Sequence, residues 1–233
     1  MTMHSASHGR RKTVAGIGMV LAPLFFLGSA IVSPALHSDE GAQIASIASD
    51  MDRWFASSLL GLFSLIALVP AILGLMHMLR ERENTLGDVG GGFGLVGAMF
   101  AMGGTAISMV MWQMASGGAD RGEMVSLLTR LHDTAGVSVP FFFGAFALAV
   151  GLVLLAAGLM RAHAAHWTSA GSLAVGAVLF VVASATFTTG LMIVAAAFAT
   201  VGLVPIGLRV LDEPVEDWEH TPEVTGFRPL AGH

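Results

Sequence analysis

Four histidines have the arrangement that a membrane cytochrome would need. His77 and His163 lie close to basic residues, and His37 and His132 lie close to acidic ones. Imidazole ligates haem iron and also transfers protons near neutral pH. Haem-ligating histidines normally lie within helices, whereas these four fall at the ends of apolar segments. The sequence therefore favours interfacial or solvated histidines and predicts no cofactor, with haem b held by these residues as an alternative.

An acidic stretch of the chain accompanies two of these histidines. Carboxylates and imidazoles are common ligands of divalent cations, so a metal site is chemically reasonable here. Its candidate ligands are His37, Asp39, Glu40, His132 and Asp133. Their spacing matches no metal-binding loop, which favours solvated loop charge and leaves the metal site as an alternative.

Sequence motifs that are typical of enzymes provide little evidence for catalysis in this chain. The segment 92–97 matches G-x-G-x-x-G, but no strand precedes it, so a glycine-rich helix contact is the better interpretation. The chain has no Cys, no Gly-x-Ser-x-Gly motif and no His-Glu-x-x-His motif. We therefore predict no catalytic residue and favour a non-enzymatic protein, although the sequence does not decide this.

The elements that would position these residues are helices that span a membrane. Only 12% of the residues are charged and 55% are hydrophobic, with a mean hydropathy of +0.76. Soluble proteins carry about 25% charged residues. This composition excludes an ordinary soluble enzyme, a disordered chain and a nucleic-acid-binding protein.

Charge-free segments divide the chain into six spans. A bilayer core takes about 20 helical residues, and the last segment, 167–208, has 42 residues without a charge. One helix of that length would extend about 63 Å, so we expect two helices with a tight turn near 186–190. The predicted spans are 14–36, 55–79, 91–114, 137–160, 169–186 and 190–208.

The basic residues predict the orientation of this bundle. With six spans, one side carries eight Lys and Arg and the other carries three. A five-span arrangement leaves the two sides nearly equal, and the first apolar segment is too long for a signal peptide. We therefore expect an all-α, multi-pass protein of the inner membrane with both termini cytoplasmic. Its parts are a cytoplasmic segment 1–12, a six-helix transmembrane domain 13–208 and an acidic, proline-containing cytoplasmic tail 209–233 that is extended or disordered.

Two segments on the acidic side carry apolar residues at helical spacing. In 37–53, the helical spacing of Ile44, Ile47 and Met51 predicts that part of the segment lies on the membrane surface. The segment 115–136 predicts an amphipathic helix. Its apolar residues are Met124, Leu127, Leu128 and Leu131.

The spans themselves contain no charge at bilayer depth, which argues against a pump or an ion-coupled transporter. The polar residues at depth are mild, namely Ser29, Ser64, Thr105, Ser108 and Ser184. Small residues recur four positions apart and predict close helix packing, within the chain or in contact with a membrane-protein partner or a second copy. These pairs are Gly18/Ala22, Ser57/Gly61, Gly90/Gly94, Ala147/Gly151, Ser172/Gly176 and Ala195/Ala199.

Three functions are consistent with these features. The first is a non-enzymatic protein that contacts lipid and a partner within a membrane assembly. The second is a binder or permease for an apolar small molecule or lipid, with a cavity lined by Met and Phe. The third is a redox protein that holds haem b or quinone.

The chain also resembles a family of bacterial six-helix membrane proteins known only as a domain of unknown function. The resemblance covers roughly residues 10–208 and rests on a basic start, a short turn and a segment that leads into two coupled spans. These are Arg10-Arg11-Lys12, Leu79-Arg80-Glu81-Arg82 and His166-Trp167-Thr168-Ser169-Ala170-Gly171. It implies the fold and the location, and it identifies no catalytic residue.

Overall fold

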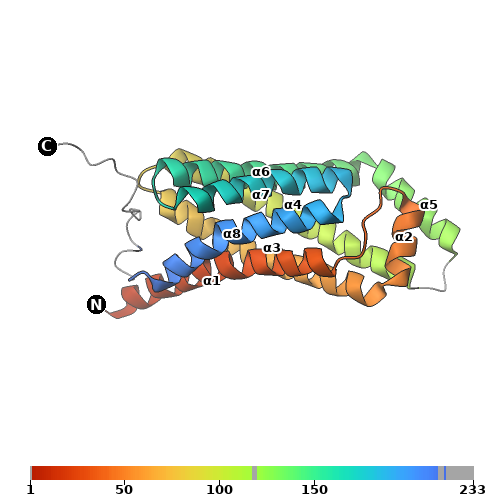
Figure 1. The fold of residues 1–233 in the computed structure, drawn as a ribbon, viewed down its shortest axis with the longest axis horizontal. Coiled ribbons are helices and arrows are strands. Elements are labelled where there is room, and N and C mark those ends of the chain that lie inside the picture. The colour runs from red at the N-terminus through yellow and green to blue at the C-terminus, as the bar shows by residue number, and fades with distance from the viewer. Residues whose placement is uncertain (1, 117–119, 215–217, 219–233) are drawn as a thin grey trace.

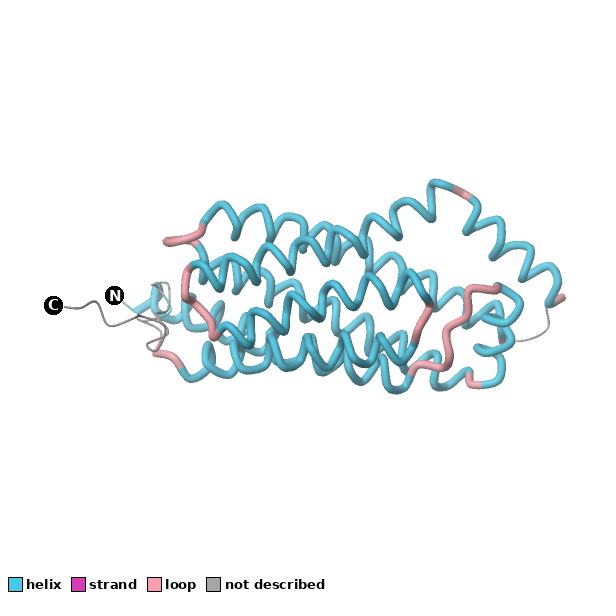
Figure 2. Tube along the Cα trace, turned by 45° about the horizontal axis from the view of Figure 1, so that its top comes forward, coloured by secondary structure: helices cyan, strands magenta, loops and turns pink. Residues whose placement is uncertain are grey.

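The computed structural model describes residues 2–116, 120–214 and 218, with side chains for all of these except 2–8, 132, 135–138, 140 and 141. Every regular element in the described residues is a helix (Figure 2). The eight helices are α1 (Thr2–Val32), α2 (Glu40–Ser49), α3 (Met51–Leu79), α4 (Asn84–Ala115), α5 (Arg121–Asp133), α6 (Ala135–Arg161), α7 (Trp167–Thr186) and α8 (Thr189–Asp212).

Six of these helices, α1, α3, α4, α6, α7 and α8, are long and apolar enough to cross a membrane. The prediction of an all-α bundle with six spans is therefore confirmed. Each spanning helix packs against the next one along the chain, and α8 packs against α1, so the six form a closed ring. Helix α1 begins and α8 ends at the same end of this ring, which we call the terminal end (Figure 1). The opposite end is the far end.

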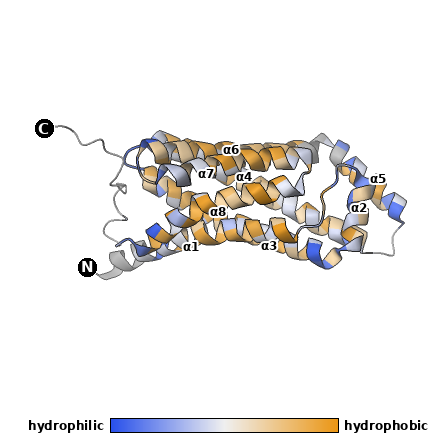
Figure 3. Ribbon diagram, in the orientation of Figure 1, coloured by the Kyte–Doolittle hydropathy of each residue, from blue (hydrophilic) through white to orange (hydrophobic). Residues whose placement is uncertain are grey.

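The polar and apolar residues are distributed as a bilayer requires. Apolar residues cover the middle of the bundle, and polar residues gather at its two ends (Figure 3). Large side chains face outward along the spans, including Met99 at 70% exposure, Phe146 at 59% and Val201 at 56%. In water such a surface would be unfavourable, whereas in a bilayer it contacts lipid chains.

The helices α2 and α5 cover the far end of the bundle. Ile44 and Ile47 of α2 and Leu128 of α5 are buried in one cluster with Trp54 and Met111 of the spanning helices. The amphipathic helix expected in 115–136 is therefore present. The helix expected in 37–53 is also present, but its isoleucines pack against protein and do not form a face that contacts lipid; its location at the membrane surface stays a prediction. Burial against Trp54 and Met111 removes the apolar face of α2 from contact with water.

The turn between α7 and α8 lies where the sequence predicts it, but another residue makes it. Phe187 ends α7 in the left-handed conformation, with φ of 51° and ψ of 35°. The predicted turn segment ends in Gly190, yet Gly190 lies within the first turn of α8. A left-handed residue after a helix is common, although glycine is the usual choice.

Most of the small residues predicted to allow close packing do so within the chain. A Cβ atom at Gly151 of α6 would lie 2.6 Å from Cα of Gly94 in α4. A Cβ atom at Gly176 of α7 would lie 2.9 Å from the amide nitrogen of Ala199 in α8. A Cβ atom at Gly18 of α1 would likewise meet the backbone of α3. These contacts hold neighbouring helices of the ring together.

Candidate functional site

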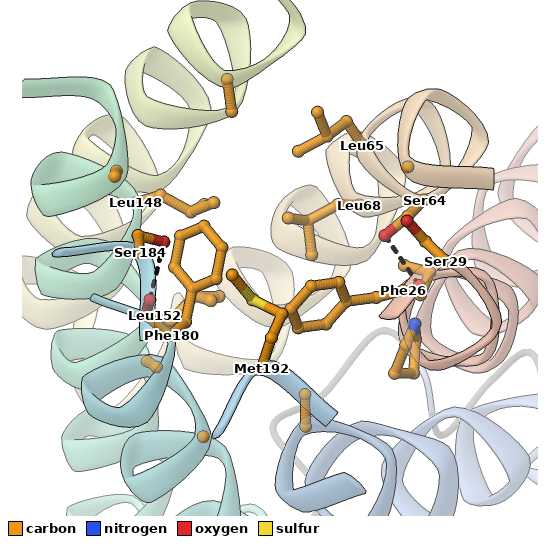
Figure 4. A pocket seen from close by; sticks show the side chains of 18 of the residues that line it. Phe26, Ser29, Ser64, Leu65, Leu68, Leu148, Leu152, Phe180, Ser184 and Met192 are labelled. Atoms are coloured by element: carbon orange, nitrogen blue, oxygen red, sulfur yellow. Dashed lines mark hydrogen bonds between the residues drawn. The ribbon is translucent and has the colours of Figure 1, made fainter. Parts of the chain in front are cut away.

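The spanning helices line a partly open cavity of about 310 Å³ (Figure 4). All six spanning helices contribute to its wall. This volume falls within the usual range of small-molecule pockets, about 300–1,000 Å³. The cavity is therefore a concave feature of the described structure that could hold a ligand.

The location of the cavity follows from the sizes of the side chains along the helices. Toward the terminal end, large residues fill the centre of the ring, among them Leu75 and Leu79 of α3 and Leu155 and Leu159 of α6, all fully buried. Closer to the far end, small residues from several spanning helices line the cavity instead. They include Ala22, Gly61, Gly104, Ala145 and Ala177. Space remains because these short side chains do not reach the middle of the ring.

Aromatic and sulfur-containing side chains form the apolar part of the wall. The rings of Phe26 and Phe180 meet edge to face, with centroids 5.7 Å apart and an interplanar angle of 79°. Met192 lies beside them (Figure 4). The sequence hypothesis of a cavity with Met and Phe in its wall agrees with this lining. Thioether and aromatic groups adapt to ligands of varied shape.

The five mild polar residues that the sequence places at bilayer depth all line this one cavity. The hydroxyl of Ser29 in α1 donates to the carbonyl of Ser57, 2.8 Å away, and that of Ser64 in α3 donates to the carbonyl of Ala22, also at 2.8 Å. Both bonds link α1 to α3. The residues from α4 and α7 bond within their own helices instead.

These remaining hydroxyls donate to carbonyl oxygens four residues earlier. Thr105 donates to Ala101 at 3.1 Å and Ser108 to Gly104 at 3.3 Å. Ser184 donates to Phe180 at 2.8 Å. Such bonds satisfy the hydroxyl hydrogen and leave oxygen lone pairs directed elsewhere.

No ionisable side chain occurs among the described residues that line the cavity. Groups of this kind carry out acid–base and nucleophilic catalysis. The lining of the cavity therefore suits binding of an uncharged molecule.

The haem candidate His77 lies at the terminal end, in the last turn of α3, and is occupied by protein contacts. Its ring stacks on Trp218, with centroids 4.6 Å apart and an interplanar angle of 18°. Its Nε2 is 2.9 Å from the carbonyl oxygen of Trp218, and its Nδ1 is 3.0 Å from Nη1 of Arg80. Since a carbonyl only accepts and a guanidinium only donates, these contacts require the neutral ring with its hydrogen on Nε2.

Two other histidines of the haem hypothesis, His163 and His37, are not among the described residues that line the cavity. His163 is exposed and follows the end of α6 in a left-handed conformation, with φ of 53°. His37 is exposed in the connection before α2, where its backbone amide donates to Oε1 of Gln43 at 2.7 Å. His132 belongs to α5, and its side chain is outside the described part of the structure. The prediction of no cofactor and the alternative of haem b both stay untested.

The acidic candidates for the metal site have roles at helix ends. Asp39 caps α2 by accepting from the amide of Ala42 at 2.7 Å, and Glu40 begins that helix. Asp133 is exposed at the end of α5. Among the residues whose side chains are described, no group of three His, Asp or Glu could hold a metal ion. Because His132 falls outside that set, the proposed ligand group remains untested.

Sequence reasoning missed Trp218, which the predicted tail places in an extended or disordered segment. Its side chain is only 5% exposed and joins the apolar core. An isolated tryptophan in an otherwise acidic stretch was the available signal. The rest of the tail beyond Pro214 lies outside the described residues.

Comparisons with family models, with curated proteins and with solved structures gave no match to this chain. The resemblance to a family of bacterial six-helix proteins therefore remains a prediction. The function is therefore inferred from the cavity and the residues around it.

Proposed function

We propose that this protein binds an apolar small molecule or lipid inside the membrane, in the cavity lined by its six spanning helices. The observation that carries the proposal is the cavity itself, about 310 Å³ in volume, with Phe26, Phe180 and Met192 in its wall. Close packing is the rule in protein interiors, and voids of this size are few. An unfilled void of this size is unfavourable for packing, so a bound molecule is the simplest explanation for it.

The other two functions considered from the sequence have less support. A protein that acts by contact with a partner would need free small-residue faces, and many of those residues contact neighbouring helices of the same chain, as Gly94 and Gly151 do. A haem b protein would need a ring nitrogen at the cavity, and none of the described lining residues is a histidine. Partner contact and haem or quinone binding remain alternatives that the experiment below also examines.

The proposed location is the inner membrane, with the terminal end in the cytoplasm. Basic residues support this orientation. The terminal end carries Arg10, Arg11, Lys12, Arg80, Arg82, Arg161 and Arg209, whereas the far end carries Arg53, Arg121 and Arg130. Cytoplasmic loops are enriched in Lys and Arg.

Native mass spectrometry of the protein in lipid nanodiscs tests the proposed binding. We expect a co-purifying apolar molecule that is lost in Ala177→Leu, which extends a side chain into the cavity from α7. The matched control is Ala185→Leu, an exposed position on the same helix. Ala145→Leu fills the cavity from α6 and serves if Ala177→Leu does not fold. Ligand retention in both filled variants would refute the cavity as the binding site.

The same preparations address the alternatives and the orientation. A Soret band in the visible spectrum would favour haem, and a co-purifying protein would favour a membrane assembly. The chain has no native cysteine, so single cysteines report topology without background. In sealed right-side-out vesicles, an impermeant maleimide should label Ser38→Cys at the far end and spare Thr85→Cys near the terminal end. The reverse labelling pattern would contradict the orientation.

A further inference from the structure

We infer that the cavity selects an uncharged apolar molecule that carries a hydrogen-bond donor, such as a hydroxyl or N–H group. This inference rests on the proposed function and specifies its ligand. It comes from the hydrogen-bond state of the five hydroxyl groups in the cavity wall.

Each of these hydroxyl groups already donates its one hydrogen to a backbone carbonyl. The distances from oxygen to carbonyl oxygen are 2.8 Å for Ser29, Ser64 and Ser184, 3.1 Å for Thr105 and 3.3 Å for Ser108. A hydroxyl oxygen has two lone pairs in addition to its donated hydrogen. The wall therefore offers acceptors whose own donors are already in use.

Trp54 and the helix backbone supply donors near the wall that are also occupied. The indole nitrogen of Trp54 donates to the carbonyl of Ser108 at 2.9 Å. The backbone amides of the spanning helices donate within those helices, and Pro23, which lines the cavity, has no amide hydrogen. Among the described residues that line the cavity, no lysine, arginine, histidine or amide side chain supplies another donor.

Because the wall offers available acceptors while its donors are in use, the cavity favours some ligands over others. A ligand that donates gains a hydrogen bond to a serine or threonine oxygen without breaking any existing bond. A ligand that only accepts, such as a ketone, ether or ester, has to redirect a hydroxyl and break its bond to the backbone. For Ser29 and Ser64, that bond also joins α1 to α3. A buried polar group without a partner is costly, so the difference favours donors.

The absence of charge in the described wall and the volume of the cavity further restrict the class of ligand that can bind. An ion would lie in an apolar wall without a counter-charge, which disfavours ammonium and carboxylate compounds as well as charged lipid headgroups. An engineered cavity of about 150 Å³ holds benzene, and the present cavity of about 310 Å³ has roughly twice that volume. A molecule of about two fused aromatic rings has the matching size.

Three naphthalene compounds of similar shape test this inference. 2-Naphthol carries a donor, 2-methoxynaphthalene carries only an acceptor, and naphthalene carries neither. Their dissociation constants are measured by calorimetry with the full chain in nanodiscs, and titrations of Ala177→Leu correct for partitioning into lipid. We expect 2-naphthol to bind about 10-fold more tightly than 2-methoxynaphthalene, the equivalent of about one good hydrogen bond.

Variants then locate the acceptor. Each cavity hydroxyl is removed in turn by Ser→Ala or Thr→Val, and at least one substitution should reduce the preference for 2-naphthol to less than threefold. Thr186→Val is the control, because Thr186 bonds its own helix at 2.8 Å but does not line the cavity. Binding of the wild-type chain already decides the main question if some variants do not fold.

The outcomes separate this inference from the proposed function. If no naphthalene compound binds in a way that Ala177→Leu abolishes, the proposed cavity binding fails. If all three bind but 2-methoxynaphthalene binds as tightly as 2-naphthol, the cavity is a binding site and the donor preference is wrong. An unchanged preference after removal of every hydroxyl would also overturn the inference.

Discussion

Gly151 of α6 lies directly against the backbone of Gly94 in α4, and its position leaves no room for a side chain. A Cβ atom built on Gly151 would lie 2.6 Å from Cα of Gly94 and 2.6 Å from the carbonyl oxygen of Gly90. Real Cβ atoms do not approach backbone so closely. The separation of the two helices, and with it one side of the ring, depends on this pair.

Substitution of Gly151 by alanine should therefore destabilise the protein, even though alanine has the better helix propensity. We expect a loss of about 1–3 kcal/mol in the free energy of unfolding in detergent micelles, because the backbones must move apart. Gly92→Ala is the control, since nothing lies within 4 Å of a Cβ atom there. It should be neutral or stabilising by up to about 1 kcal/mol. Equal effects at the two positions would contradict the packing argument.

At Phe187, substitution by glycine is expected to raise the free energy of unfolding, the opposite of the effect at Gly151. Its left-handed conformation, with φ of 51°, is unfavourable for a residue with a Cβ atom. Phe187→Gly should raise the free energy of unfolding by about 1 kcal/mol. Ala185→Gly, two residues earlier in the helical part of α7, should lower it by about 1 kcal/mol. Chemical denaturation of both variants provides the comparison, and destabilisation by Phe187→Gly would refute the prediction.

Trp218 should stabilise the terminal end of the bundle through its contact with His77. The indole is 5% exposed, and its ring centroid lies 4.6 Å from that of His77. Trp218→Ala should cost about 3 kcal/mol and lower the melting temperature, as truncation of a buried tryptophan does. Trp167→Ala removes a side chain that is 56% exposed and should cost much less. Similar melting temperatures for the two variants would show that Trp218 is not part of the core.

Lys12 forms a cap for the end of α8. Its Nζ donates to the carbonyl oxygens of Leu211, at 3.3 Å, and of Glu213, and the side chain is only 7% exposed. These carbonyls have no partner within the helix, and a positive charge near them interacts favourably with the negative end of the helix dipole. Lys12→Met should cost about 1.5–3 kcal/mol.

Arg11→Met provides the matched control for Lys12. Arg11 is exposed one position earlier in α1, so its substitution should change the unfolding free energy by less than about 0.5 kcal/mol. Thermal unfolding in the same detergent measures both variants. A loss at Arg11 as large as at Lys12 would indicate a general effect of positive charge and would contradict the specific cap.

The number of the spans could be predicted because it depends on local composition, whereas their ends were less accurate: the predicted span 14–36 continues four residues past the end of α1, and the predicted span 91–114 begins seven residues after the start of α4. A helix in a bilayer needs about 20 apolar residues, whatever its neighbours are. The predicted span 169–186 differs by two residues from α7 at its start, and the predicted 55–79 shares its last residue with α3. The amphipathic helix α5 was predictable for the same reason, because its apolar residues recur with helical periodicity.

The candidate site could be predicted only in its chemical composition. Ser29, Ser64, Thr105, Ser108 and Ser184 were recognisable as polar residues at bilayer depth, but nothing local indicates that all of them face one cavity. Which way each helix is rotated depends on how small residues fit against its neighbours. That fit involves residues far apart in the chain, such as Gly94 with Gly151.

The sequence by itself determined an all-helical membrane bundle with six spans, because hydropathy over about 20 residues decides which segments can enter lipid. Only the tertiary structure decided the closed ring, the cavity at its centre, the burial of Ile44 and Ile47, and the contact of Trp218 with His77. Each of these depends on distances between separate helices. Lipid solvates every apolar face of a spanning helix equally well, so packing between side chains sets those distances.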